Sequence, residues 1–471
     1  MRVRNYLKLG CAFAFFLTAD CTLGQNIELL SMPAYTPMGV PPLPWQDAVP
    51  PVTGASEAPF NEVAQPSSES PVGGVPGAAI CRCQRCPHGR CQCPETAQPC
   101  QECPRVNNIN PAWSLILGGW VTADTLFNSA RPIAPGTPFF LTPRGPFEDE
   151  TFDIHARQTS IYLAAKGPKV GDYESGGLIM FNFYNDSIVV DRYGVLPYQA
   201  YGELKNECWR FAGGLQMDIF APVLPTVLPF SFLAASGNTG IYRGQLRAER
   251  FYHPAKDRQL TLTVGISDAN PTLLNNDVLT EDNGWPNVEV RAAWAAGPLK
   301  QVGLAAQRPF EVGVSGVVGQ VRTTEIALMA DQVVADVWGV AGDYRWRVAE
   351  DWGFAGEFFT GQGLGTYGGG ILQTVNSATF EAVETTGGWA EVYYYLNPCV
   401  HTHWGYGVDN PSNDDLAAAQ VSYNDTIFAN LIWDVTQSFR IAFEFTYRQT
   451  EYVVLPANDG VGLHSQIQWK F

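Results

Sequence analysis

Eight charged residues recur at spacings that would gather their side chains on a common surface. Arg243, Arg247 and Glu249 alternate with apolar residues, so they would share one face of a β-strand. The same rule gives a polar strand face to five further arginines: Arg157, Arg210, Arg291, Arg345 and Arg440. Guanidinium groups held in a narrow, partly dehydrated space attract carboxylates and phosphates. The alternative is that these arginines only neutralise carboxylates of the same wall: Glu249, Glu289, Asp343 and Glu444.

Seven cysteines form a second cluster, placed well before the arginines. They are Cys81, Cys83, Cys86, Cys91, Cys93, Cys100 and Cys103. Their Cys-x-Cys and Cys-x-x-Cys spacings suit soft metal ions, but tetrahedral zinc sites usually have two well-separated pairs. In an exported chain, disulfides or cross-links to another molecule are the preferred interpretation. We therefore predict cross-linking cysteines and no metal site.

Other residue patterns that could support catalysis are weak. Cys399, His401 and His403 share one strand face and could form a metal pocket, but histidines in such walls more often bond to polar neighbours. The sequence has six histidines, and none lies in a recognisable nucleophile motif. No phosphate-binding or dinucleotide-binding glycine loop follows a predicted strand. The sequence thus predicts neither an enzyme nor a cofactor.

The elements that would position the arginines are short segments of alternating polarity, which begin at Trp113. Each is near the length of about 10 residues that a tilted membrane strand needs. Sixteen segments fit: 113–127, 152–166, 174–185, 197–205, 208–219, 241–252, 259–268, 286–296, 309–321, 333–346, 352–361, 387–396, 399–408, 424–435, 438–449 and 462–471. Only 16% of the residues are charged, against about 25% in a typical soluble domain. We predict an all-β fold, a transmembrane antiparallel β-barrel of about 16 strands, with the eight charged residues named above lining its pore.

Loop lengths and the polarity of the two strand faces support a barrel in the outer membrane. Connections after even-numbered strands are mostly short, and those after odd-numbered strands are mostly long, as in bacterial outer-membrane barrels. In segment 438–449, Phe443 and Phe445 share a face opposite Glu444 and Thr446. A soluble barrel with this pattern would be polar outside, whereas the aromatic end at Phe471 suits a lipid-facing girdle.

The residues before the barrel divide into three predicted parts. Residues 1–24 have a basic start and a short apolar run, as expected of a signal peptide. Residues 25–80 are a Pro-rich linker, and residues 81–110 are the Cys-rich segment; together they form an extension that we expect to be disordered. Residues 111–471 form the barrel, with both chain ends in the periplasm. The net charge of −17 argues against a nucleic-acid partner.

Several motifs resemble those of known outer-membrane proteins. The final segment, His464 to Phe471, resembles the C-terminal signal that the barrel-assembly machinery reads, which would make Phe471 an assembly signal. The segments 157–160, 200–203 and 213–220 resemble three consecutive strands of the DcaP-type trimeric porins, over roughly residues 110–255. Residues 25–110 lack the heptads of the coiled coil that precedes the barrel in that family. The resemblance implies a homotrimer of 16-stranded barrels that passes small, often anionic, solutes.

An apolar, proline-stiffened loop at 221–233 should influence what passes through such a barrel. Exposed to solvent, this apolar loop would promote nonspecific association. We therefore expect it to fold into the barrel as a constriction or to lie at a subunit contact. Its key residues are Pro222, Pro225, Pro229, Phe230 and Phe232. The sequence therefore predicts a porin for small hydrophilic, preferentially anionic, solutes, in contact with outer-membrane lipid. The alternative is a structural or adhesive envelope protein, anchored by the barrel and cross-linked to a periplasmic or envelope partner through its cysteines.

Overall fold

The computed structural model describes residues 113–146, 149–185, 188, 191–269, 284–302, 305–322 and 333–471. The predicted signal peptide, linker and Cys-rich segment, including all seven clustered cysteines, lie outside these residues. In the part of the chain that is described, no helix is long and apolar enough to cross a membrane.

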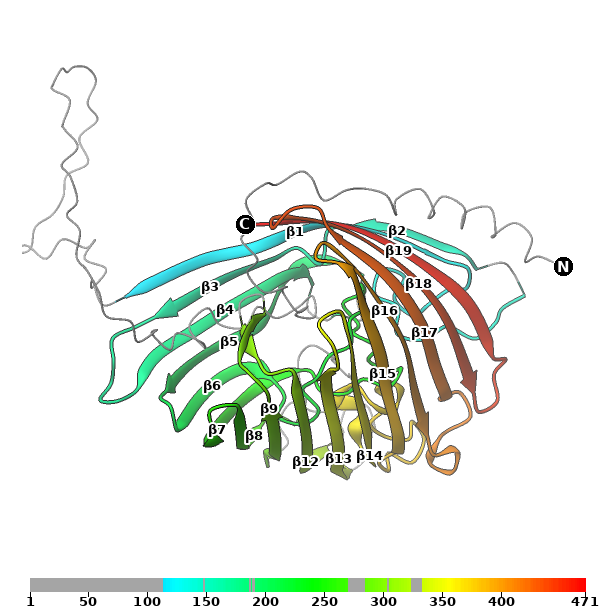
Figure 1. Ribbon diagram of the computed structural model, residues 1–471. Helices are drawn as coiled ribbons and strands as arrows, with labels where there is room; N and C mark the ends of the chain where they lie inside the picture. The colour runs from blue at the N-terminus through cyan, green and yellow to red at the C-terminus, as the bar shows by residue number, and fades with distance from the viewer. Residues whose placement is uncertain are drawn as a thin grey trace, which may run out of the picture. The chain divides into compact units, whose positions relative to one another are not determined.

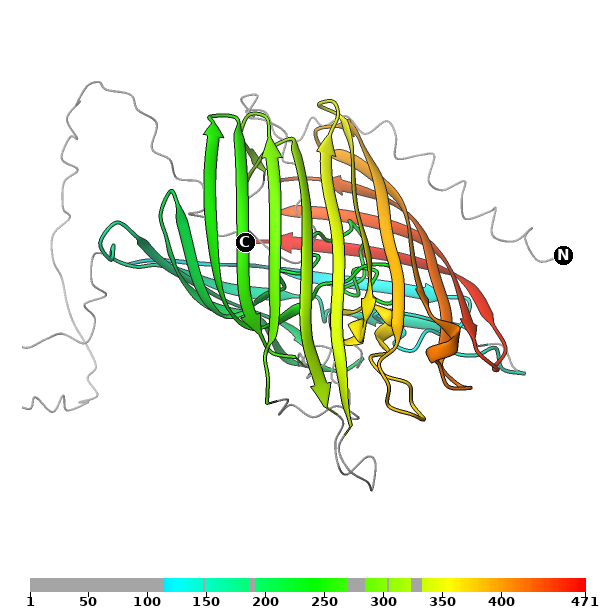
Figure 2. The ribbon, with the colours of Figure 1, turned by 90° about the horizontal axis from the view of Figure 1, so that it is seen from below.

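The strands form one closed antiparallel sheet (Figures 1 and 2). It has sixteen strands, as predicted, when the two parts of one broken strand are counted together. The first half of the chain supplies β1 (Ser114–Asn128), β2 (Thr151–His155), β3 (Ser160–Lys166), β4 (Glu174–Tyr184), β5 (Tyr193–Lys205), β6 (Trp209–Met217), β7 (Tyr242–Ala255), β8 (Arg258–Ser267) and β9 (Asn287–Ala296). The second half supplies β12 (Phe310–Arg322), β13 (Val334–Arg347), β14 (Trp352–Gln362), β15 (Glu384–Asn397), β16 (Val400–Pro411), β17 (Val421–Asp434), β18 (Phe439–Tyr452) and β19 (Asn458–Lys470). β2 and β3 pair one after the other with β1 and act as one broken strand.

The prediction of an unbroken strand over 152–166 was wrong at its centre. Between β2 and β3 the chain makes a turn, in which the Thr159 N–H donates to the Ala156 carbonyl. The turn carries Arg157 inward, where its guanidinium pairs with Asp153 and Asp191. The ladder with β1 is interrupted where this buried guanidinium meets the two half-buried carboxylates. Sequence analysis also missed a small hairpin, β10 (Lys300–Val302) with β11 (Ala305–Gln307), between β9 and β12.

The barrel closes where the first and last strands meet. β1 pairs with β19 from Trp120 opposite Lys470 to Asn128 opposite Gly462. Two backbone hydrogen bonds between Gly119 and Phe471, of 3.1 and 3.2 Å, extend this seam to the last residue. Closure leaves no unpaired edge that lipid would have to solvate.

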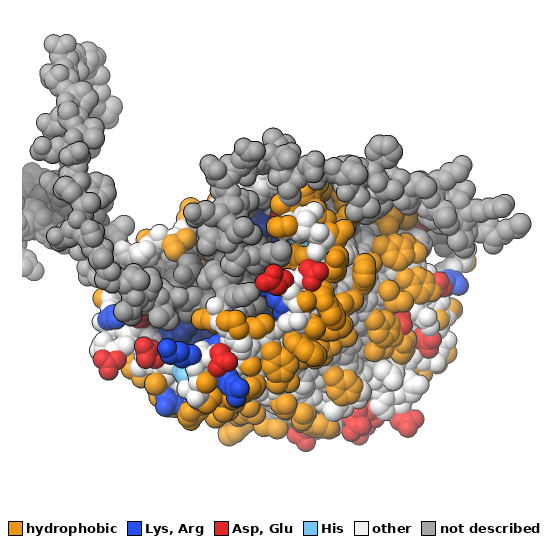
Figure 3. All heavy atoms as spheres, in the orientation of Figure 1, with side chains coloured by type: hydrophobic (Ala, Val, Ile, Leu, Met, Phe, Trp, Pro, Cys, Tyr) orange, Lys and Arg blue, Asp and Glu red, His pale blue; other side chains and the backbone are white. Residues whose placement is uncertain are grey.

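The two faces of the wall have the inverted polarity that the sequence predicted. On β18, Phe443 and Phe445 are exposed on the outer face, whereas Glu444 and Thr446 are buried on the lumen face. Figure 3 shows hydrophobic side chains spread over the outer surface of the strands in view. An apolar exterior of this kind is stable against lipid and not against water.

Loop lengths follow the predicted parity with two exceptions. Counted around the barrel with β2 and β3 as one strand, the connection 297–309 follows the eighth strand, β9, but is long, because it contains the β10–β11 hairpin. The connection 453–457 follows the fifteenth strand, β18, and is short. The long loops 129–150 and 218–241, and the loop 363–383 with its 3₁₀ turns η3 (Leu364–Tyr367) and η4 (Gly370–Leu372), reach residues on the lumen face of the wall. A third 3₁₀ turn, η5 (Asn413–Asp415), lies in the loop after β16.

Candidate functional site

Carboxylates of the barrel wall bind the backbone of loop 218–241. Glu289 on β9 accepts hydrogen bonds from the N–H groups of Ile219 and Phe220, at 2.7 and 2.9 Å. On the opposite side of the barrel, Glu444 on β18 accepts the N–H of Leu228 at 2.9 Å. The loop thus crosses the interior and is fixed to the wall at both sides, because each buried N–H needs an acceptor.

Between these two points, Glu357 on β14 and Glu391 on β15 hold further parts of the loop. Glu357 accepts the Thr239 N–H at 3.2 Å. Glu391 accepts both the N–H and the hydroxyl of Thr226, at 2.8 and 2.9 Å. Carboxylates that accept backbone N–H groups form strong, charge-assisted bonds, so loop 218–241 is a fixed element of the lumen.

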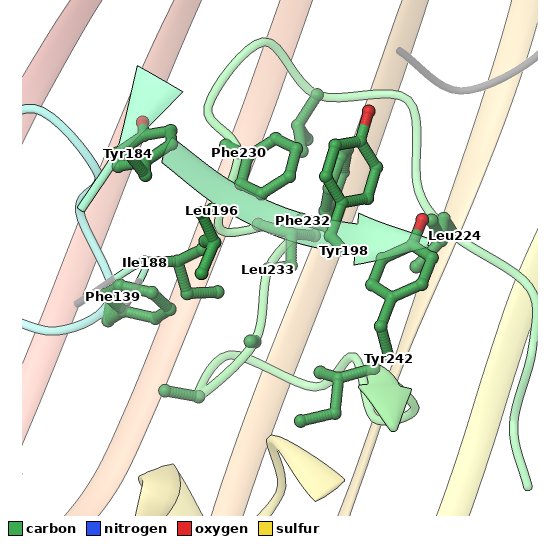
Figure 4. Close-up of a cluster of buried hydrophobic side chains, with 14 of the residues drawn as sticks. Phe139, Tyr184, Ile188, Leu196, Tyr198, Leu224, Phe230, Phe232, Leu233 and Tyr242 are labelled. Atoms are coloured by element: carbon green, nitrogen blue, oxygen red, sulfur yellow. The ribbon is translucent and has the colours of Figure 1, made fainter. Parts of the chain in front are cut away.

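The predicted constriction residues lie in this loop and face the wall. Phe230 stacks on Tyr184 at 5.4 Å between ring centroids and meets Tyr198 edge-on at 5.6 Å. Phe232 packs beside Phe230, with ring centroids 5.0 Å apart (Figure 4). Pro222, Pro225 and Pro229 have no N–H group, so the segment they stiffen presents few donors that need an acceptor. The amides of Thr226 and Leu228, between these prolines, are the ones that the glutamates bind.

Arg243 joins two loops to the wall. Its Nε lies 2.6 Å from Oδ1 of Asp218, and its terminal nitrogens donate to the carbonyls of Thr366 at 2.8 Å and Asp268 at 2.7 Å. The guanidinium carbon lies 3.6 Å above the ring centre of Tyr367. The Arg243 side chain is 0% exposed. The structure therefore places Arg243 where a solute in the lumen cannot touch it without displacing these loops.

Asp218, the partner of Arg243, lies in the loop just beyond β6. The pKa of the Asp218 carboxyl is raised to about 7, because burial and the nearby Glu289 raise it more than the Arg243 guanidinium lowers it. Asp218 Oδ2 also accepts the Ile241 N–H at 2.9 Å. Asp218 thus connects the two ends of its own loop, and the Arg243 cation stabilises the ionised form of its carboxyl.

Arg210, Arg247 and Glu249 come together on the lumen face of β6 and β7. The Arg210 guanidinium lies 2.5 Å from Glu203 on β5 and 2.5 Å from Glu249. Arg247 shares Glu249 at 3.5 Å and donates to the Met217 carbonyl. Two arginines therefore share two carboxylates, so this part of the predicted row of lumen arginines carries little net charge.

Arg291 and Arg345 form a second group on β9 and β13. Arg291 lies 2.6 Å from Asp343 and 3.1 Å from Glu311 of β12, and Arg345 lies 3.2 Å from the same glutamate. The Arg345 side chain is 39% exposed, whereas that of Arg291 is 12% exposed. Arg345 is therefore the member of this group that solvent in the lumen reaches.

Arg157 and Arg440 lie apart from both groups. Arg157 pairs with Asp153 and Asp191 in the break between β2 and β3. Arg440 on β18 makes two hydrogen bonds to Asp434, at 2.6 and 2.8 Å, and Lys470 on β19 lies 3.7 Å from Asp434. The eight predicted lumen residues are thus spread over several places, and each arginine has a carboxylate partner.

Sequence analysis missed several residues that do most to organise the lumen. They are the loop-binding Glu357 and Glu391, the shared Glu203 and Glu311, and the more exposed Lys470. Each stands at a polar position of its alternating strand, which signals the lumen face. The alternation of polarity alone does not show which carboxylate pairs with an arginine and which accepts hydrogen bonds from a loop.

The residues considered as metal ligands do not form a metal site in the described part of the chain. No group of three His, Cys, Asp or Glu side chains able to hold a metal occurs there. His401 and His403 bond to each other, with their facing ring nitrogens 2.9 Å apart. Cys208, in the turn before β6, is a free and exposed thiol.

A closed antiparallel barrel with an apolar exterior, charged lumen and inward loop has the architecture of outer-membrane pore proteins. The sequence matches no family model and no curated protein. The structure is similar to that of the outer-membrane channel DcaP of Acinetobacter baumannii, with a TM-score of 0.60 and 16% identity over 77% of this chain and 98% of that one. It is also similar to an anion-selective porin from Comamonas acidovorans, with a TM-score of 0.50 and 9% identity over 76% and 100% of the two chains. The chain therefore has the porin fold, and the predicted likeness to DcaP-type barrels is confirmed at the level of fold.

Proposed function

We propose that this protein is an outer-membrane porin through which small hydrophilic solutes, preferentially anions, diffuse. The fold and the charged lumen face support diffusion through the barrel, since sixteen strands are enough for an aqueous channel. The barrel would lie in outer-membrane lipid with both chain ends in the periplasm, as the predicted signal peptide and the even strand number require. A homotrimer, which the likeness to DcaP-type porins implies, is part of the proposal.

The preference for anions rests on which lumen charges solvent can reach. Arg345 is 39% exposed and its partner Glu311 is 24% exposed; Lys470 is 36% exposed and its partner Asp434 is 24% exposed. In each pair the cation is the more accessible member, and only accessible charges act on a passing solute. Arg243, in contrast, would act on the loops, and the other arginines would balance the wall.

Neutralising the two accessible cations tests this assignment. We expect R345Q and K470Q together to move the reversal potential, measured in planar bilayers under a salt gradient, towards cation selectivity. The single-channel conductance should change by less than about twofold, because the lumen width is unaltered. The variant R131Q is the matched control, since Arg131 is exposed in a loop and pairs with Asp149 outside the strands. An unchanged reversal potential in the double variant would refute anion preference at these residues.

The alternative function, a structural or adhesive envelope protein, has its own supporting observation. Three loops reach into the lumen, and apolar side chains of loop 218–241 pack there against Tyr184, Tyr198 and Tyr242. Swelling of liposomes that contain purified protein, tested with sugars, amino acids and dicarboxylates, separates the two functions. A porin makes the liposomes swell at rates that depend on solute size and charge, whereas a plugged barrel does not.

A further inference from the structure

Two histidines of β16 touch each other on the lumen face of the wall. Nδ1 of His401 lies 2.9 Å from Nε2 of His403, and both side chains are buried. A hydrogen bond at this distance needs one ring nitrogen to donate a proton and the other to accept it. When both rings are cationic, both nitrogens carry protons and the contact becomes repulsive. The bond therefore exists only while at least one ring is neutral.

His401 faces an acidic and an aromatic group from its two neighbouring strands. Its Nε2 lies 3.6 Å from Oδ2 of Asp434 on β17, and its ring stacks on Tyr395 of β15 with centroids 4.9 Å apart. Arg440 on β18 and Lys470 on β19 share the same Asp434. Asp434 thus already has two cationic partners, which leaves it less able to hold a cationic His401.

His403 faces the residues that hold loop 218–241. Its Nδ1 lies 3.4 Å from Oε1 of Glu391 on β15, and its ring lies against Tyr393 with centroids 5.7 Å apart. Its backbone N–H donates to Oδ1 of Asn430 on β17 at 3.1 Å. Asn430 Nδ2 in turn lies 3.3 Å from Glu444 of β18, which is paired across the sheet with His464 of β19.

Thr226 is the point where this network meets the loop. Glu391 accepts the Thr226 N–H and hydroxyl, at 2.8 and 2.9 Å, and Asn430 Nδ2 donates to the Thr226 carbonyl at 2.6 Å. Both residues that hold Thr226 are therefore in contact with His403. Any displacement of the His403 ring changes the surroundings of Glu391 and, through Glu391, the attachment of the loop.

We propose that His401 and His403 form a proton-operated switch that fixes loop 218–241 to the wall at Thr226 and releases it in acid. Addition of the second proton breaks the bond between the rings and turns His403 towards Glu391. The cationic His403 then competes with Thr226 for the carboxylate oxygens. The segment 225–229 leaves the wall, moves into the lumen and narrows it. The electrical test of this switch rests on the proposed porin function.

Single-channel recording across a pH range provides that test. We expect the current of the wild-type protein to fall reversibly by at least about threefold between about pH 7 and about pH 3, because burial opposes the second positive charge and moves its uptake into acid. The double variant H401Q/H403Q should conduct as the wild type does at the higher pH and lose the response, because Gln can donate and accept but cannot become cationic. The control H253Q, at an exposed histidine near the end of β7, should keep it.

A second measurement keeps the switch testable if the protein does not conduct. Deuterium uptake of the peptide 222–233, corrected for the intrinsic effect of pH on exchange, should rise in acid in the wild type and not in H401Q/H403Q. A conducting protein whose current and uptake ignore pH overturns the switch and leaves the porin function standing. A response that survives in H401Q/H403Q, or that is lost in H464Q instead, also overturns it, because the sensor would then lie elsewhere. Absence of current with pH-dependent uptake refutes only the porin function.

Discussion

The variant R243M should be less stable than the wild-type barrel by about 3–5 kcal/mol at about pH 8, because it leaves a buried carboxylate without its cation. Arg243 is fully buried and bonds to Asp218 and to the Thr366 carbonyl of a second loop. Met fills similar space without donors, so the loss reflects the missing charge and hydrogen bonds. Urea-induced unfolding in lipid vesicles, followed by tryptophan fluorescence, measures the difference. The loops should also become mobile, which recordings would show as increased open-channel noise.

The defect of R243M should shrink as the pH falls. Burial already raises the pKa of Asp218 to about 7, and removal of the Arg243 cation takes away the group that lowers it. At pH values between about 7 and the higher pKa that Asp218 has once the cation is gone, the folded variant binds a proton that the folded wild type does not. The stability of the variant relative to wild type must therefore rise as the pH falls through that window. A defect that stays constant between about pH 9 and about pH 7 would contradict this account.

Removal of both partners gives the matched control. D218N/R243M leaves neither charge buried, so it should recover part of the stability lost in R243M, and its stability relative to wild type should not change between about pH 9 and about pH 7. Arg345, which is partly exposed and pairs with Glu311, offers the comparison at an accessible site. R345M should cost no more than about 1 kcal/mol, since exposed ion pairs contribute little. Equal losses in R243M and R345M would mean that burial does not distinguish the two arginines.

The strands could be predicted from the sequence because lipid imposes the same alternation along their whole length. Phe443 and Phe445 must face the membrane, so Glu444 and Thr446 must face the lumen, and this rule repeats around the barrel. It fails where a lumen contact outweighs strand pairing. Arg157 turns inward to Asp153 and Asp191, and the predicted strand breaks into β2 and β3.

The organisation of the lumen could be predicted only in part. The polar face was assigned from periodicity. Pairs such as Arg291 with Asp343 were foreseen as the alternative to a row of arginines without carboxylate partners. The use of Glu391 and Glu444 to bind loop amides was not foreseen. Thr226 and Glu391 lie 165 positions apart in the chain, and only the closed barrel brings them together. Local patterns carry no information about such contacts, so the loop attachments required the structure.

Replacement of residues 222–233 by a short Gly-Ser linker should raise the single-channel conductance severalfold, by about threefold or more, since conductance follows the width of the lumen. The segment lies inside the barrel, where Glu391 and Glu444 hold it against the wall and Phe230 packs on Tyr184. After its removal water can hydrate these glutamates, so the barrel should still form. Planar-bilayer recording measures the change, with heat-modifiable migration on gels as the check on folding.

A smaller replacement, in a loop outside the lumen, provides the comparison. Residues 453–457, between β18 and β19, are exposed, and their replacement by Gly and Ser should leave the conductance within about twofold of the wild type. If removal of 222–233 leaves the conductance unchanged while the barrel folds, the loop does not limit the passage. The narrowest part of the lumen would then lie with the packed loops 129–150 and 363–383. Thr226 and its glutamates would hold a structural element without control over the pore.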